Sequence, residues 1–381
     1  MKITPLAMVD DLLAVAPCGM ESLAVNVFIN TQIEMKKLKF HTPDASGKSK
    51  CNKFLIGKEG ITCPDLKVHG THMGQVTEDT YLGDIVSQDG SNLKNVRSRV
   101  GKGIGIISQI MTILETVSFG EYYFQIAMTL RETMLLNGIL MNSEIFYNLK
   151  QTEIEEFEEL DRCLLRKIFG TKISCPKEAL HLESGTLSIG TLIKSKRIIY
   201  LHYLVMEQEN TMLSKFFQAQ YDFEIKNDWT TSVRKDLNDY GIHVDLNYIT
   251  SKSEYTFKAQ NYELHRLNTM KGSKMENTFH AKLEMQSYLK LKNISAEDAK
   301  LVFAYRTRMA NFSEHFRGPH GPKMCSLCST HLDNQPMAFN CPTIKPKLDN
   351  KGKYEYVFRS QVPLETIQNL KIVTRIREEN D

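Results

Sequence analysis

Two adjacent carboxylates, Asp10 and Asp11, stand inside an apolar run near the amino terminus. The surrounding residues 3–16 predict a buried β-hairpin with the pair at its turn, where charge is rare without a reason. Carboxylate oxygens are the ligands that Mg²⁺ prefers, and two such cations can bridge a nucleoside triphosphate and a primer hydroxyl. The pair therefore indicates a magnesium-dependent nucleotidyl transferase, and the alternative is a solvated turn.

A second set of ligand-type residues lies near the carboxy terminus and has the spacing C-x2-C-x2-H-x9-C: Cys325, Cys328, His331 and Cys341. Thiolate and imidazole are the donors that Zn²⁺ prefers. Four protein ligands would leave no open position, so we expect a structural zinc at this site. The spacing differs from that of a retroviral zinc knuckle, C-x2-C-x4-H-x4-C.

The elements that would position these residues are mostly helical. Apolar residues at helical spacing predict helices over Glu21–Lys39 and Asn92–Leu114. Thr152–Glu155 predicts a capping box that opens a helix ending at Gly170. Further predicted elements are a helix through Leu187–Val205, a helix from Trp229 closed by Gly241, a linker at 319–322, a polar loop over Lys345–Lys353 and a last helix after Pro363.

Several motifs together resemble the reverse transcriptases of non-LTR (LINE-type) retrotransposons. Met8-Val9-Asp10-Asp11 resembles their palm motif C, and Gly47-Lys48-Ser49-Lys50 resembles motif D. Tyr81-Leu82-Gly83, with Asp89-Gly90, resembles motif E, the primer grip. The order of these motifs along the chain is that of the family, which is more specific than any one motif.

The resemblance continues toward the carboxy terminus. Met134–Ile139 with Ser143-Glu144 is similar to the apolar thumb segment, and Ile193–His202 is similar to the helical region after it. The cysteines resemble the family's Cys/His segment, whose pattern C-x2-C-x7-H-x4-C would place its histidine at Pro336. Proline cannot bind a metal, so either His331 or His320 completes the zinc site, or the site is degenerate.

The resemblance implies an α+β fold that is predominantly helical. A truncated palm, a β-hairpin plus a helix, would occupy residues 1–90 and carry motifs C, D and E. A helical thumb would follow over 91–170 and a helical post-thumb region over 171–318. A Cys/His zinc-knuckle-like module and a carboxy-terminal helix would occupy 319–381.

The resemblance also implies roles for individual residues. Asp10 and Asp11 would hold Mg²⁺, and Lys48 would lie near the triphosphate and give a proton to the leaving pyrophosphate. Tyr81, Leu82 and Gly83 would hold the primer. Seven cationic side chains would contact the phosphates of RNA or DNA: Lys94, Arg97, Arg99, Lys102, Arg306, Arg308 and Arg317. Solvated helix faces or turns are the alternative for each cationic residue.

By resemblance, the parent enzyme is an RNA-directed DNA polymerase that copies an RNA template from a DNA primer at a nicked target. Motif A, with a third metal-binding carboxylate, should precede Asp10, yet only nine residues do. We therefore expect a fragment that is inactive alone. The alternatives are a non-catalytic nucleic-acid-binding or interaction remnant and an inert pseudogene product.

Composition limits the remaining classes. The chain has 381 residues and a net charge of +3, which excludes a globally basic protein. Its eight cysteines are mostly scattered, which is typical of reduced thiols in a nuclear or cytoplasmic protein. The Asp10–Asp11 pair interrupts the apolar start, so we expect no signal peptide, and no stretch is long enough to predict a membrane span.

Overall fold

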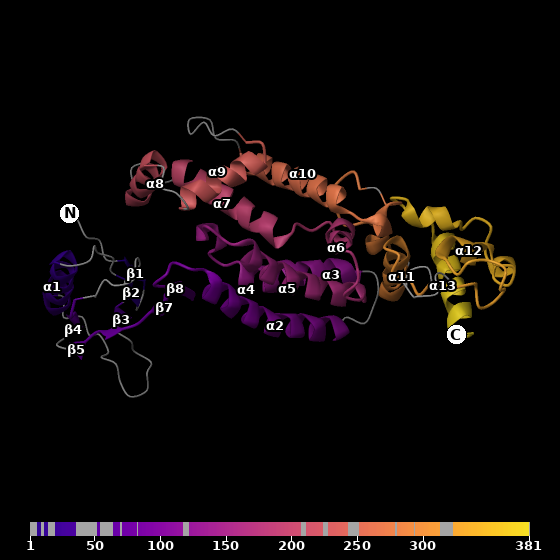
Figure 1. The fold of residues 1–381 in the computed structure, drawn as a ribbon, viewed down its shortest axis with the longest axis horizontal. Coiled ribbons are helices and arrows are strands. Elements are labelled where there is room, and N and C mark those ends of the chain that lie inside the picture. The colour runs from indigo at the N-terminus through magenta and orange to yellow at the C-terminus, as the bar shows by residue number, and fades with distance from the viewer. Residues whose placement is uncertain are drawn as a thin grey trace. The chain divides into compact units, whose positions relative to one another are not determined.

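The computed structural model describes residues 6–8, 11–13, 20–35, 52–53, 64–68, 71–81, 83–116, 122–206, 211–223, 228–242, 251–278, 280–292, 294–312 and 323–380. This part of the chain is predominantly helical, with a few short strands, which confirms the predicted class (Figure 1). Contacts divide the chain into two units, Met1–Arg99 and Val100–Asp381. None of the described helices is both long and apolar enough to cross a membrane.

The described part of the amino-terminal unit contains helix α1 (Met20–Met35), the first turns of the helix that begins at Leu93, and pairs of short strands. Strand β1 (Leu6–Met8) lies antiparallel to β2 (Asp11–Leu13), with Met8 opposite Asp11. The other described pairs are β3 (Asn52–Lys53) parallel to β6 (Gly74–Gln75), β4 (Lys67–Val68) antiparallel to β5 (Thr71–His72), and β7 (Glu78–Tyr81) antiparallel to β8 (Asp84–Ser87).

The β7–β8 hairpin is fastened to the start of α2 (Leu93–Thr116) by charged side chains. Asp84, on β8, accepts hydrogen bonds from the guanidinium of Arg99 and from the amide of Asn95. Lys94 forms an ion pair with Glu78 on β7. Arg99 and Asp84 are largely shielded from water, and an ion pair counts for more there than in solvent.

The carboxy-terminal unit is built almost entirely from helices. The described elements are α3 (Tyr123–Leu130), η2 (Arg131–Leu136), α4 (Asn137–Ile139), η3 (Ser143–Ile145), α5 (Gln151–Phe169), α6 (Lys177–Ser184), α7 (Ile189–Met206), α8 (Met212–Phe223), α9 (Trp229–Asp239), α10 (Lys252–Met270), η4 (Ser273–Met275), η5 (Ser287–Lys290), α11 (Ala296–Arg306), α12 (Gln335–Asn340), η7 (Lys345–Lys347), η8 (Tyr354–Phe358) and α13 (Leu364–Glu378).

Helix α5 is central to this unit and packs on α6 and α7 (Figure 1). Its predicted apolar face is buried at Phe157, Leu164 and Ile168, and Gly170 ends it in the left-handed conformation, with φ of 62°. The predicted capping box is shifted by two residues. The carboxylate of Glu153 accepts the Lys150 backbone N–H at 2.8 Å, so the helix begins at Gln151.

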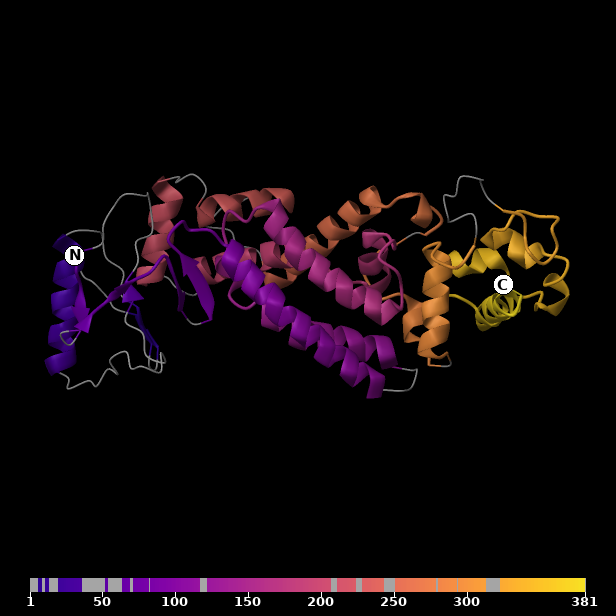
Figure 2. The same ribbon diagram turned by 60° about the horizontal axis from the view of Figure 1, so that its bottom comes forward.

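Helix α10 packs on α7, and α11, α13 and η8 contact one another. The orange helix α11 and the yellow carboxy-terminal helix α13 lie next to each other in Figure 2. The rings of Phe169 on α5 and Phe303 on α11 stack, with centroids 4.2 Å apart. The predicted helices beginning at Trp229 and after Pro363 are both present, as α9 and α13. The stacked Phe169–Phe303 pair therefore links α5 to α11, which in turn contacts α13.

Candidate metal centre

Three cysteine thiols converge in the carboxy-terminal part of the second unit. The sulfur atoms of Cys325, Cys328 and Cys341 all lie within 4.8 Å of one another. Cys325 and Cys341 are buried, and Cys328 is partly exposed. Soft thiolate donors at this spacing suit a soft or borderline cation, so the cluster can hold a metal ion such as zinc.

A tight loop brings the first two thiols together. The backbone N–H of Cys325 donates to the carbonyl of His331 at 2.8 Å, and the N–H of Asp333 donates to Lys323 at 2.8 Å. Between these bonds, Ser329 adopts a left-handed conformation with φ of 53°. These backbone bonds close the loop without using any side chain from the cluster.

The third thiol is placed by helix α12. Asn334 caps this helix by accepting the N–H of Met337 at 2.9 Å, and Cys341 follows its last turn. The side chain of Gln335 is held by the Tyr354 hydroxyl at 2.8 Å. Asp333, one residue before the cap, forms a 2.6 Å ion pair with Arg377 of α13. The cluster is therefore anchored to the last helix.

The surroundings of Cys328 favour the thiolate form of its side chain. The Thr330 hydroxyl donates to the sulfur of Cys328 at 3.1 Å, and this hydrogen bond, together with those from the backbone of Thr330 and His331, lowers the pKa of Cys328 to about 6. Cys328 is therefore largely a thiolate at neutral pH, which is the form that binds metals. Burial raises the pKa of Cys325, so a bound cation would have to stabilise that thiolate.

The predicted fourth ligand is not part of this cluster. His331 does not lie within 4.8 Å of the three sulfurs, so the geometry does not support its ring as a ligand. His331 instead helps to close the loop, because its backbone carbonyl accepts the hydrogen bond from the N–H of Cys325. Pro336 lies in the first turn of α12. His320, the other proposed ligand, lies outside the described residues.

A row of exposed lysines follows the third cysteine. Lys345, Lys347, Lys351 and Lys353 form no ion pair within the described part of the chain, and we call residues 345–353 the lysine segment. The N–H of Lys345 donates to the carbonyl of Cys341 at 2.8 Å, so the segment starts at the metal cluster itself. Lysine clusters of this kind attract phosphate.

The lysine segment has a defined backbone. The amide of Asn369 on α13 donates to the carbonyls of Asp349, at 2.8 Å, and Gly352, at 2.6 Å. The side chain of Asp349 accepts the N–H of Lys351 at 2.7 Å, so it is engaged locally. The sequence predicts a polar loop here, and its repeated lysines with a single carboxylate are the signal that points to a cationic surface.

The structure contradicts one predicted nucleic-acid contact. Arg306 is only 1% exposed. Its guanidinium lies 2.9 Å from the carboxylate of Glu183 and donates to the carbonyl of Val357 at 2.7 Å. The prediction for Arg306 is therefore wrong, and so is the alternative of a surface helix position. Arg308 is partly exposed and left-handed, with φ of 52°, and its role stays a prediction.

Some of the other predicted site residues lie outside the residues that the structure describes. Asp10, Lys48, Leu82 and Arg317 lie outside them. The backbone of Asp11 opens β2. Tyr81 ends β7, and Gly83 turns the chain toward β8 with φ of 87°.

The cationic residues predicted on α2 differ in their surroundings. Lys94 forms an ion pair with Glu78, and Arg99 forms an ion pair with Asp84. Arg97 and Lys102 are exposed. The roles of Arg97 and Lys102 toward nucleic acid therefore stay predictions.

Comparison with known proteins adds no assignment. No family model matches the chain, and the searches of curated proteins and of solved structures find no match either. The cysteine cluster and the lysine segment beside it are therefore the features from which a function can be argued.

Proposed function

We propose that this chain binds nucleic acid through a zinc-stabilised module, as the carboxy-terminal part of a LINE-type reverse transcriptase. The observation that carries the proposal is the junction at Cys341. This residue contributes a thiol to the cluster, and its carbonyl accepts the N–H that begins the lysine segment. A metal bound by the thiols would hold the lysines in place.

Zinc is the ion that fits the donor set best. It binds thiolates readily in structural sites and has no redox chemistry of its own. The module has few helices to hold it together, since α12 has six residues. Metal binding therefore contributes directly to folding in this part of the chain. A fourth ligand beyond the three cysteines completes the tetrahedron, and His320 is the residue that the sequence offers.

Nucleic acid fits the lysine segment because its charge is nearly all of one sign. Each lysine that neutralises a phosphate releases counterions, which makes binding salt-dependent. If all four lysines of the segment contact a single strand, the logarithm of the binding constant should fall with the logarithm of salt concentration with a slope of about −3. Such contacts carry no sequence information.

A metal assay on the full chain tests the zinc part of the proposal. We expect about one zinc per chain by mass spectrometry of the bound metal. Cys341→Ser should lose it. Cys163→Ser, which removes a half-buried thiol on α5, should keep it. Equal zinc content in both variants, or none in the unaltered chain, would reject the site.

Fluorescence anisotropy with labelled single-stranded RNA and DNA tests the binding part. Replacing Lys345, Lys347, Lys351 and Lys353 by glutamine should weaken binding and flatten the salt dependence. A control with the same loss of charge replaces the exposed residues Lys172, Lys235, Lys282 and Lys290. If both quadruple variants bind alike, the lysine segment is not the interface.

RNA-directed DNA polymerisation is the second candidate. It is favoured by the antiparallel pairing of β1 and β2, which matches the hairpin expected around the Asp10–Asp11 pair. Primer extension on poly(rA)/oligo(dT) with Mg²⁺ tests it. Incorporation that Asp10→Ala abolishes would establish an enzyme that holds Mg²⁺ through this pair. Salt-sensitive binding without incorporation would leave the binding module as the function.

A further inference from the structure

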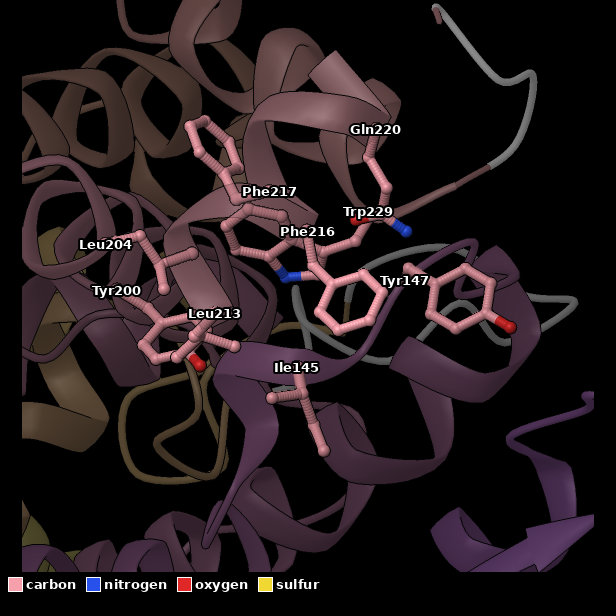
Figure 3. Close-up of a pocket in the computed structure, with 9 residues that line it drawn as sticks. All are labelled: Ile145, Tyr147, Tyr200, Leu204, Leu213, Phe216, Phe217, Gln220 and Trp229. Carbon is pink, nitrogen blue, oxygen red and sulfur yellow. The ribbon is translucent and has the colours of Figure 1, made fainter. Parts of the chain in front are cut away.

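An open pocket of about 250 Å³ lies in the second unit, away from the cysteine cluster in sequence. Its walls come from η3 and the residues after it, from α7, from α8 and from α9 (Figure 3). Five aromatic side chains and one amide matter for its chemistry: Tyr147, Tyr200, Phe216, Phe217, Trp229 and Gln220. No charged side chain lines it.

The aromatic walls are held in place by packing. The ring of Trp229 meets Tyr200 edge-on at 5.7 Å and Phe217 at 6.2 Å. Its indole N–H donates to the carbonyl of Glu144 at 2.7 Å. Phe216 and Gln220 lie one helical turn apart on α8, so both face the same hollow. The pocket is therefore largely formed before any ligand arrives.

Two polar groups of the lining, on Gln220 and Tyr200, can serve a ligand. Within the described part of the chain, neither the amide of Gln220 nor the hydroxyl of Tyr200 has a hydrogen-bond partner. Burial, followed by the charge of Glu144, raises the pKa of Tyr200, so its hydroxyl stays a donor. An amide both donates and accepts. These groups suit a neutral, flat ligand with a mixed donor and acceptor edge.

Charged residues of both signs lie beside the pocket: Glu144 precedes Ile145 and its charge acts on Tyr200, and α8 carries both Lys215 and Asp222. Lys215 directly precedes Phe216 on this helix, and Lys150 follows Tyr147 by three residues. Both lysines are exposed and form no ion pair with the described residues. An uncharged aromatic hollow with lysines at neighbouring positions is complementary to a flat neutral ring carried on a phosphate backbone.

We propose that this pocket takes one unpaired nucleobase of a single-stranded nucleic acid. The base stacks on the aromatic side chains, Gln220 bonds its edge, and Lys215 meets the adjacent phosphate. This inference rests on the proposed nucleic-acid binding and adds a second, base-contacting site to it. It also assigns a use to Phe216, whose ring is 62% exposed.

The only tryptophan of the chain, Trp229, lines the pocket, so intrinsic fluorescence reports its occupancy. The test titrates the full chain with a short labelled single strand and with a matched strand of abasic sites. Anisotropy measures total binding, and tryptophan emission measures the pocket. We expect quenching by the strand with bases and none by the abasic strand.

Variants complete the test. Phe216→Ala should weaken binding of the strand with bases by about 5- to 150-fold, the range that one stacked base supplies. Gln220→Ala should also weaken it, with Trp229 still in place. The matched control is Phe257→Ala on α10, since Phe257 is also 62% exposed and lies outside the pocket. It should bind like the unaltered chain.

The outcomes separate the two proposals. If no strand binds by anisotropy, the proposed function fails and this inference fails with it. If strands bind but Trp229 is not quenched, or if Phe216→Ala matches Phe257→Ala, only the pocket assignment fails. Quenching by an apolar peptide and not by the strand with bases would overturn it in favour of a protein partner.

Discussion

Replacing Glu183 by glutamine should destabilise the second unit strongly, because this side chain is the centre of a buried polar cluster. Glu183, on α6, is 0% exposed. Its carboxylate accepts from Arg306 Nε at 2.9 Å, from the Tyr288 hydroxyl at 3.0 Å and from His280 Nε2 at 3.1 Å. The cluster thereby ties α6 to η5, α11 and the segment around His280.

The size of the effect follows from the charge of the cluster. Burial by itself raises the pKa of Glu183, but the charge of Arg306 and the hydrogen bond from His280 lower it to about 2. Relative to a usual value of 4.5, this corresponds to about 3 kcal/mol in favour of the folded state at neutral pH. Leaving the guanidinium of Arg306 buried without a counter-charge costs about 3–5 kcal/mol in total, and this total includes the free energy given by the pKa, because both describe the same ion pair.

Urea unfolding followed by far-UV circular dichroism measures this loss. The control is Glu297→Gln, which removes an exposed carboxylate that pairs with Lys300 on α11, where an effect below about 1 kcal/mol is expected. The contribution of Glu183 is present above its unfolded pKa and is lost as pH falls toward 2. The gap between the unaltered chain and Glu183→Gln should therefore be constant near neutrality and shrink below about pH 4.5.

Two results would refute this reasoning. One is a loss for Glu183→Gln no larger than that for Glu297→Gln. The other is strict additivity of Glu183→Gln with Arg306→Met, since groups in direct contact should couple by about 0.5–3 kcal/mol.

Three further predictions concern other parts of the second unit. Gly103→Ala should lower the free energy of unfolding by about 1–3 kcal/mol, because a Cβ there meets the side chain of Leu160. Gly101→Ala has open space around the new Cβ and should stabilise α2 by about 0.5–1 kcal/mol. Equal effects of the two variants in urea unfolding would contradict this. Burial raises the pKa of Glu158 to about 7, so the free energy of unfolding should fall as pH rises from about 4.5 to 7, and Glu158→Gln should remove that slope. Chelating the zinc proposed at the cysteine cluster should speed the hydrogen exchange of the backbone amides in α12 and leave that of α5 unchanged. Equal exchange with and without chelator would count against a structural metal.

Local signals in the sequence located many of the elements. The apolar spacing in Phe157–Ile168 predicted the buried face of α5, because a helix repeats every 3.6 residues whatever it packs against. Gly170 and Gly241 predicted helix ends because glycine takes the left-handed conformation at little cost, and both residues adopt it. The spacing of Cys325 and Cys328 likewise indicated half of a metal site.

Contacts between distant residues could be decided only by the tertiary structure. Arg306 is separated from Glu183 by 123 positions, so nothing near Arg306 in the sequence signals its burial. The same holds for the pocket around Trp229, for the anchoring of the lysine segment by Asn369, and for the exclusion of His331 from the cysteine cluster. Residue types and short spacings determine which chemistry and which helices are possible, whereas the packing of helices far apart in the chain decides which side chains meet and which reach solvent.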